Sequence, residues 1–312
     1  MKGKDLLSIA DLSRQDILSL ISGAIDMKAL GWLSLLTNKS LAILFEKPSL
    51  RTRVSFEVAM RQLGGEAIYI SPAEVGLNTR ESTPDVARVL CRYVNAVTAR
   101  TFSHKTLETL AEYANVPVIN ALSDREHPCQ ALADLLTIYE KKGGLNGLTL
   151  AYIGDGNNVA NSLLLAAALT GINFKIASPK GYQIRDEILS EGQSYAKESG
   201  GSVFLTEEPQ VAVDDADIIY TDTWTSMGQE SEEKERRRIF SRYQVNEDLV
   251  SLARKDVILM HCLPAHHGEE VAAEILDSPI SVVFDQAENR MHIQKAILAD
   301  ILGGQGIPLA GS

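Results

Sequence analysis

The stretch "FEKPSLRTRVSFEVAM", Phe45–Met60, contains the end of an apolar run, a proline turn and the start of an amphipathic helix. The preceding residues, "SLAILFE" (40–46), have the composition of a buried strand. Ser49 is a suitable helix N-cap, and Gly64 and Gly65 end the apolar periodicity. The stretch therefore predicts a strand followed directly by a helix, the repeating unit of an α/β fold.

Similar apolar runs recur along the chain, with helical patterns between them. They occupy residues 40–46, 66–72, 95–101, 116–122, 148–154, 173–179, 216–222, 256–264 and 281–286. Continuous apolar strands that alternate with helices predict parallel sheets covered on both faces. We therefore expect an α/β protein with two doubly wound parallel-sheet domains joined by interdomain helices.

Glycine and charge interrupt this pattern at "EKKGGLNGL", Glu140–Leu148. The interruption predicts a first domain over residues 1–142 and a second over residues 143–286. In the last helix, residues 287–312, an apolar stripe at Ile293, Ile297 and Ile301 needs a packing partner. We expect this helix to pack back on the first domain.

Composition limits the possible partners. The 312 residues are 45% hydrophobic and 23% charged, which is typical of a globular protein, and the net charge of −11 disfavours nucleic acid. The three scattered cysteines indicate a reducing compartment. The first residues lack the continuous apolar segment of a signal peptide, and no later apolar run reaches membrane-spanning length. We expect a cytoplasmic protein with small-molecule ligands and no nucleic-acid or membrane partner.

Polar residues follow many of the expected strands. Ser49, Arg100, His127, Asp222 and His261 all lie at or just beyond the carboxyl end of one. Ligands of open parallel sheets bind at these ends. The sequence therefore predicts binding sites built from the loops that follow the strands.

The first turn of the helix after Ser49 holds two arginines, Arg51 and Arg53, beside Thr52. Cations are misplaced at a helix N-terminus by a few tenths of a kcal/mol, because the helix dipole is already positive there. Two guanidinium groups and the first-turn N–H groups together predict a socket for a phosphate-like dianion. A solvated basic turn is the alternative for this motif taken alone.

In "DREHPCQALADL", Asp124–Leu135, Pro128 suits the first helical position and places His127 at the positive end of the dipole. A neutral imidazole is favoured there and can polarise a carbonyl oxygen, while Gln130 can hold an NH2 group. An N-cap histidine without a ligand is the alternative. Elsewhere, Leu263 precedes a proline, which leaves its carbonyl available to accept a hydrogen bond.

The motifs S-x-R-T-R, H-P-x-Q, "TDTWTSMG" and "HCLP" occur in this order. With them, nearly the whole chain resembles the aspartate/ornithine carbamoyltransferase superfamily, and within it the ornithine carbamoyltransferases. The resemblance implies transfer of a carbamoyl group from carbamoyl phosphate to the δ-amine of L-ornithine, giving L-citrulline and phosphate. It implies no cofactor, no metal, and a homotrimer or a multiple of trimers. Whether the reaction serves arginine biosynthesis or degradation stays open.

The resemblance also implies roles for individual residues. The carbamoyl phosphate ligands would be Ser49, Leu50, Arg51, Thr52, Arg100, His127, Gln130, Leu263 and Arg290. The ornithine ligands would be Asn158, Asp222, Ser226, Met227 and Cys262. The catalytic residues would be Arg100, His127 and Cys262.

The chain departs from the family pattern at two places. Leu50 replaces a common threonine, which matters little if that position contributes its backbone N–H. The segment "EVGLNTRES" lacks the glutamine that often reaches a neighbouring subunit's site, so this contact between subunits is in doubt.

Other readings are open at this stage. "GDGNNVANS" resembles a dinucleotide-binding turn, but Val159 stands where the last glycine is required. Cys262 and nearby histidines suggest a metal, yet no second cluster completes four ligands. A non-catalytic binding protein, or an enzyme acting on putrescine, N-acylated ornithine or aspartate, are further alternatives. The charged run Glu230–Arg238 predicts a solvated helix face with pairs such as Glu232–Arg236 and Glu233–Arg237.

Overall fold

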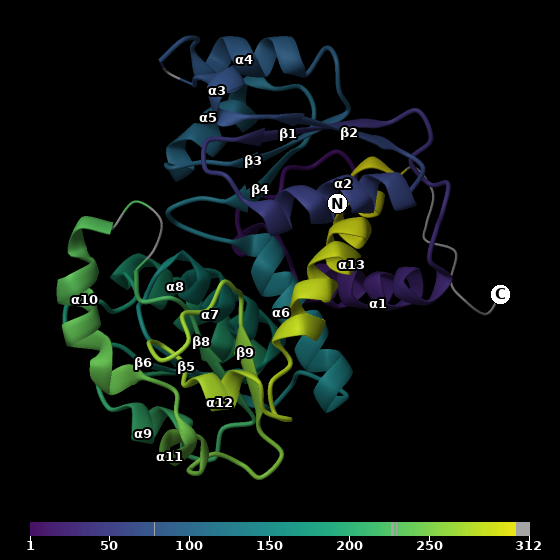
Figure 1. Cartoon of the computed structure of the whole chain (residues 1–312). Coiled ribbons are helices and arrows are strands. Elements are labelled where there is room, and N and C mark those ends of the chain that lie inside the picture. The colour runs from purple at the N-terminus through teal and green to yellow at the C-terminus, as the bar shows by residue number, and fades with distance from the viewer. Residues whose placement is uncertain (78, 226–227, 229, 304–312) are drawn as a thin grey trace. The chain divides into compact units, whose positions relative to one another are not determined.

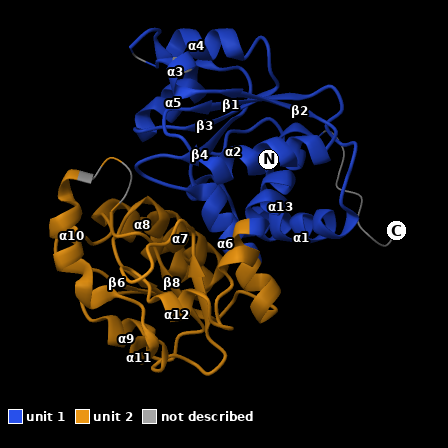
Figure 2. Cartoon of the chain, in the orientation of Figure 1, with its two compact units in different colours: residues 1–136, 288–312 blue, residues 137–287 orange. Residues whose placement is uncertain are grey.

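A computed structural model describes residues 1–77, 79–225, 228 and 230–303. The chain forms two compact units, each with its own parallel sheet (Figures 1 and 2). Unit 1 comprises Met1–Leu136 and Glu288–Ser312, and unit 2 comprises Thr137–Ala287. The chain passes between the units within two helices, α6 (Pro128–Lys142) and α13 (Val283–Leu302).

The sheet of unit 1 has the strand order β2-β1-β3-β4, and all its pairings are parallel. Its strands are β1 (Ser40–Phe45), β2 (Glu66–Ile70), β3 (Ala96–Arg100) and β4 (Val118–Leu122). Its helices are η1 (Ile9–Asp11), α1 (Arg14–Leu30), α2 (Leu50–Gln62), α3 (Pro72–Val75), α4 (Thr83–Leu90) and α5 (His104–Tyr113). Helices α4 and α5 cover one face of this sheet, and α2 and α13 cover the other (Figure 1). The central strands are therefore buried on both faces, which explains why β1 is a continuous apolar run.

The sheet of unit 2 has the order β7-β6-β5-β8-β9 and is also parallel. Its strands are β5 (Thr149–Ile153), β6 (Asn173–Ala177), β7 (Val203–Thr206), β8 (Ile218–Thr221) and β9 (Ile258–His261). Its helical segments are α7 (Asn158–Thr170), α8 (Asp186–Ser199), α9 (Pro209–Val213), η2 (Glu230–Glu232), α10 (Glu233–Phe240), η3 (Ser241–Tyr243), α11 (Glu247–Val250) and α12 (Ala273–Leu276). One face packs into an apolar cluster with α9, α11 and α12, and the deeply buried helix α7 packs on β6.

The expected class, two parallel-sheet α/β domains, is confirmed. One strand assignment was wrong. Residues 281–286 do not form a strand, because α13 begins at Val283 and only Ser281 bridges to β9. A short apolar run does not distinguish a strand from a buried helix start. The fifth strand is instead the edge strand β7, whose half-exposed "VFLT" sequence gave a weaker signal.

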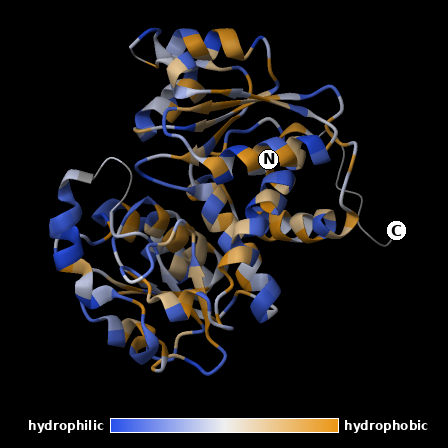
Figure 3. Cartoon of the chain, viewed as in Figure 1, coloured by the Kyte–Doolittle hydropathy of each residue, from blue (hydrophilic) through white to orange (hydrophobic). Residues whose placement is uncertain are grey.

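Apolar colour is concentrated on the strands of both sheets, whereas α10 is hydrophilic along most of its length (Figure 3). No helix in the described part of the chain combines the length and apolar character needed to cross a bilayer.

The contact between α7 and α8 depends on a glycine. A Cβ atom on Gly192 would lie 1.9 Å from Cδ2 of Leu164, whose side chain is fully buried. We predict that Gly192→Ala lowers the free energy of unfolding by about 1–3 kcal/mol, because overpacking outweighs the gain in helix propensity. Urea denaturation measures this change. Ser194→Ala, at an exposed position of α8, is the control and should be neutral or slightly stabilising; equal stability of the two variants would contradict this account.

Candidate active site

The start of α2 in unit 1 is built around Thr52. Ser49 is the N-cap: its Oγ accepts the Thr52 N–H at 3.4 Å and donates to Thr52 Oγ1 at 3.0 Å. Arg290, on α13, donates from Nη2 to the same Thr52 Oγ1 at 2.6 Å. The Leu50 side chain is 76% exposed, so this position contributes its backbone rather than its side chain to the helix start. A guanidinium group is thereby held beside the positive end of a helix dipole, where an anion is favoured.

His127 lies just before α6 and is buried with two arginines of unit 1. The exposed fractions of His127, Arg100 and Arg290 are 5%, 8% and 4%. Burial, and then the positive charges of Arg290 and Arg100, hold the pKa of His127 well below its usual 6.5. The imidazole is therefore neutral at physiological pH and can donate one hydrogen bond without adding a third positive charge.

Gln130 lies one turn further along α6 and is 1% exposed. Arg51 is half-buried on the first turn of α2. The predicted positions Ser49 and His127 follow β1 and β4, and Arg100 is the last residue of β3; these three strands are neighbours in the sheet. These groups suit a ligand with a phosphate-like dianion and a polarisable carbonyl oxygen.

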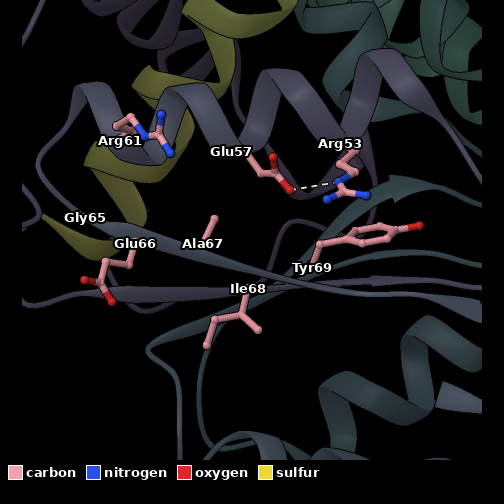
Figure 4. A pocket seen from close by; sticks show the side chains of 8 residues that line it. All are labelled: Arg53, Glu57, Arg61, Gly65, Glu66, Ala67, Ile68 and Tyr69. Carbon is pink, nitrogen blue, oxygen red and sulfur yellow. Dashed lines mark hydrogen bonds and ion pairs between the residues drawn. The ribbon is translucent and has the colours of Figure 1, made fainter. Parts of the chain in front are cut away.

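The expectation that both arginines of the S-x-R-T-R motif would serve one anion was wrong for Arg53. Its Nε donates to Glu57 Oε1 at 2.9 Å, and its guanidinium lies 4.0 Å from the centre of the Tyr69 ring. These side chains line a cavity of about 580 Å³ between the outer face of α2 and β2 (Figure 4). Arg53 is the third residue after Leu50, and the helical rotation turns it toward the edge strand.

In unit 2, Asp222 is the centre of a small polar cluster after β8. Its Oδ2 accepts from Asn157 Nδ2 at 2.8 Å, and its Oδ1 accepts from the Thr223 N–H at 2.8 Å and from Cys262 Sγ at 3.0 Å. Asp222 is 6% exposed. All three donors are neutral, so the cluster keeps the negative charge of the carboxylate and suits a cationic ligand.

Asn158, predicted to bind the acceptor, begins α7 next to Asn157 and is half-buried. Ser226 and Met227, predicted for the same ligand, lie outside the described residues. Leu263, whose carbonyl was predicted to accept a hydrogen bond, has a positive φ of 55° and precedes a cis proline.

The hydrogen bonds at the end of β9 disfavour a metal at the cysteine–histidine cluster. His261 Nδ1 accepts the Leu263 N–H at 2.9 Å, so its Nε2–H donates to Glu270 Oε1 at 3.0 Å. Glu270 also accepts the His266 N–H at 2.7 Å. Burial raises the pKa of Glu270, but the hydrogen bonds from His261 and His266 outweigh this and leave it below its usual value. Both ring nitrogens of His261 are engaged, and it could bind a metal only by losing one of these hydrogen bonds.

The glycine-rich turn after β5 is explained by backbone packing. A Cβ on Gly156 would lie 2.3 Å from the Ile184 nitrogen, and the Gly156 N–H donates to the Tyr182 carbonyl at 2.7 Å. Asn157 caps α7 by accepting the N–H groups of Val159 and Ala160. The backbone near Ile184 packs against the turn, and the Asn157 side chain already accepts the first N–H groups of α7. These groups would otherwise bind a pyrophosphate, so the dinucleotide alternative is weakened.

The charged run before and within α10 was expected to form a solvated helix face, and this was wrong for Arg236. Arg236 is 3% exposed, forms an ion pair with Asp155, and donates from Nε to the Trp224 carbonyl at 2.5 Å. Its predicted partner Glu232 lies 3.5 Å away. The predicted Glu233–Arg237 pair is present on the exposed side at 2.8 Å. Arg236 thus connects α10 to the loops after β5 and β8.

Several residues of these clusters were not predicted. Asp134, the buried partner of Gln130, could have been found from the Q-x-x-x-D spacing, which places both side chains on one helix face. Asp155 follows a strand, as the predicted residues do. Glu270 lies in a loop and meets His261 only through the fold, so no sequence pattern indicated it.

Comparisons with known proteins agree with this geometry. Residues 4–140 match the family model of the aspartate/ornithine carbamoyltransferase carbamoyl-P binding domain, and residues 146–301 match that of the Asp/Orn binding domain. The chain belongs to the aspartate/ornithine carbamoyltransferase family, and the resemblance inferred from its motifs is confirmed.

Within this family, the chain is similar to proteins named for ornithine. It is 54% identical to ornithine carbamoyltransferase of Bacillus subtilis over 300 residues, which cover 96% of this chain and 94% of that protein. It is 52% identical to the anabolic ornithine carbamoyltransferase of Pyrococcus furiosus over 308 residues, covering 97% and 98%. The solved structure of ornithine carbamoyltransferase from Pyrococcus furiosus matches with a TM-score of 0.94, covering 98% of this chain and 99% of that chain.

The Asp155–Arg236 pair should respond to pH. Burial raises the pKa of Asp155 to about 6, and the Arg236 charge lowers it only in part. The ordinary pKa of an aspartate is 3.8. Because the pKa in the folded protein is higher, protonation of Asp155 stabilises the fold fully below pH 3.8, and this stabilisation is lost as pH rises through about 6. Ionisation strengthens the pair with Arg236, which also holds the Trp224 carbonyl.

We therefore predict that Trp224 fluorescence changes with a midpoint near pH 6. Of the two tryptophans, Trp32 is 68% exposed and Trp224 is 4% exposed, so Trp32→Phe isolates the buried signal. The transition should disappear in Trp32→Phe/Asp155→Asn. An unchanged titration in this double variant would assign the transition to another group.

Proposed function

We propose that this chain transfers the carbamoyl group of carbamoyl phosphate to the δ-amine of L-ornithine, giving L-citrulline and phosphate. The observation that carries the proposal is the neutral His127 buried with Arg100 and Arg290 beside the Ser49–Thr52 helix start. Membership of the family and the relatives named for ornithine support it. The charge of each cluster suits the substrate that we assign to it.

In this proposal, unit 1 binds carbamoyl phosphate. The phosphate is held by the helix start and by the buried arginines, which match its charge: Ser49, Leu50, Arg51, Thr52, Arg100 and Arg290. Arg100 and His127 polarise the carbonyl oxygen, while Gln130 binds the NH2 group. The resemblance to the family assigns the carbonyl of Leu263, a residue of unit 2, to the same NH2 group. We propose that the carbamoyl phosphate-binding domain comprises residues 1–142 and that residues 287–312 belong to it. The ornithine-binding domain comprises residues 143–286.

Unit 2 binds L-ornithine. Asp222 receives the α-ammonium, because its three described hydrogen-bond donors are neutral and leave its charge uncompensated. Asn158, Ser226 and Met227 receive the α-carboxylate, and Cys262 lies beside the reacting amine. Putrescine would leave the groups for the α-carboxylate and α-ammonium unused, and an acylated α-amine would leave Asp222 without a cation.

The reaction begins with attack of the δ-amine lone pair on the carbamoyl carbon. A C–N bond forms, a tetrahedral intermediate carries negative charge on oxygen, and the C–O bond to phosphate then breaks. Arg100, His127 and Thr52 stabilise the oxyanion, which is usually the largest single catalytic contribution. An amine with a pKa of ~10.4 is only about one part in a thousand neutral at pH 7.4, a cost of roughly 4 kcal/mol. The enzyme selects this neutral form, and the departing phosphate accepts the proton.

We further propose a cytoplasmic homotrimer, or a multiple of trimers, working in arginine biosynthesis. The biosynthetic direction is supported by the similarity to a relative named as anabolic. Reaction chemistry alone does not distinguish biosynthesis from degradation.

An acceptor panel tests the proposed function. We expect the purified protein with carbamoyl phosphate to form ureido product from L-ornithine and not from putrescine, N-acetylornithine, L-lysine or L-aspartate. Asp222→Asn should raise KM for ornithine at least about tenfold, because a charge-assisted contact worth roughly 1.5–3 kcal/mol is lost. Turnover with another acceptor would overturn the assignment of unit 2, and no turnover by folded protein would overturn the proposal.

The pH profile tests the proton path. We expect kcat/KM for ornithine to rise about tenfold per unit from about pH 7 to about pH 9, since the neutral amine fraction rises in that proportion. The lowered pKa of His127 keeps the imidazole neutral over this range, so His127 adds no ionisation of its own. A flat profile would exclude selection of the neutral amine.

A further inference from the structure

We propose that Asp134 is a positioning residue that turns the side-chain amide of Gln130 so that its oxygen accepts an N–H of the carbamoyl group. This inference rests on the proposed function and extends it to the choice of donor substrate. Unit 1 would then distinguish a carbamoyl group from an acetyl group of nearly the same shape.

The first argument is the position of the two residues on α6. Gln130 and Asp134 are four residues apart on one helix and therefore share a face. Gln130 Nε2 donates to Asp134 Oδ1 at 2.8 Å. The exposed fractions of Gln130 and Asp134 are 1% and 0%, so water competes little for this hydrogen bond.

The second argument is the orientation of the amide. A carboxylate only accepts hydrogen bonds, so Asp134 must face the NH2 end of Gln130. The hydrogen bond to Asp134 therefore identifies the nitrogen of the Gln130 amide. The oxygen and nitrogen of an amide are too similar in size to be assigned without such a partner. The oxygen is consequently directed away from Asp134.

The third argument is that this oxygen has no hydrogen-bond partner within the described part of the chain. Gln130 Oε1 is buried and accepts no hydrogen bond from any described residue. A buried acceptor without a donor costs about 1–3 kcal/mol, so a ligand that brings a donor recovers this free energy. His127 lies three residues earlier, just before α6, and is the residue proposed to contact the carbonyl of the same ligand.

Donor selectivity follows from these contacts. A carbamoyl group places an N–H opposite Gln130 Oε1, whereas an acetyl group places a methyl group there. A site built to hydrogen-bond a polar substrate group discriminates strongly against an analogue without it, because its own buried group stays unpaired. Without Asp134, the Gln130 amide could rotate and present its NH2 end to the substrate instead.

The test compares two hydrolysis-resistant ligands that differ only in NH2 and CH3, phosphonoacetamide and acetonylphosphonate. Calorimetry gives the dissociation constant of each, with inorganic phosphate as a reference ligand. We expect the wild-type protein to prefer phosphonoacetamide and Asp134→Asn to reduce this preference about tenfold. Binding of phosphate and acetonylphosphonate should change less than about twofold, because neither offers an N–H donor.

Matched variants separate positioning from folding. Asp26→Asn, on α1 of the same unit, should leave the preference unchanged. In a Gln130→Met background, Asp134→Asn should have no further effect on the preference, because the two residues act as one unit. If Asp134→Asn does not bind phosphate, Asp134→Ser provides the same comparison.

The outcomes are distinguishable. Equal weakening of all three ligands, or an unchanged preference in Asp134→Asn, would overturn the positioning role and leave the proposed function intact. A wild-type protein that binds phosphate without preferring phosphonoacetamide would overturn this inference and count against the donor half of the proposed function.

Discussion

The phosphate-binding region of unit 1 depends on one constraint: the guanidinium groups of Arg100 and Arg290 are buried beside the imidazole of His127. Arg100 and Arg290 are less than a tenth exposed, and burial of such charges is unfavourable unless a counter-charge accompanies them. Burial and the two positive charges lower the pKa of His127, so that its imidazole is neutral. A small dianion interacts favourably with both positive charges and with the start of α2. These residues therefore favour the binding of a phosphate group.

Unit 2 has the opposite charge balance. Asp155 and Asp222 follow β5 and β8, which are neighbours in the sheet, and the Asp222 charge contributes to raising the pKa of Asp155. Arg236 compensates Asp155, whereas Asp222 is contacted by neutral donors. Asp155 therefore has a structural role, because its partner Arg236 also donates to the Trp224 carbonyl. Asp222 suits a cationic ligand.

Sequence patterns predicted the parts of the fold that repeat. Strand ends are marked by apolar runs, and parallel strands bring Ser49, Arg100 and His127 to one edge of a sheet, so these residues could be found without coordinates. Side-chain direction could not be found in this way: Arg53 and Arg236 sit in charged segments, yet one pairs with Glu57 and the other is buried against Asp155. Glu57 is only four residues from Arg53, whereas Asp155 is 81 residues from Arg236 and meets it only through packing. For the same reason, the apolar run at residues 281–286 was mistaken for a strand.

The neutrality of His127 has a consequence for the whole reaction. A residue whose pKa lies well below 6.5 is a weak base at neutral pH, so His127 is suited to donating a hydrogen bond rather than to removing the proton of an amine. The two arginines that depress its pKa also bind the group best able to accept that proton. Cleavage of the C–O bond leaves an additional negative charge on the phosphate oxygen, and the proton of the amine converts the departing group to HPO4(2−). Oxyanion stabilisation, a neutral imidazole and proton acceptance by the leaving group are therefore three results of one cluster of buried positive charge.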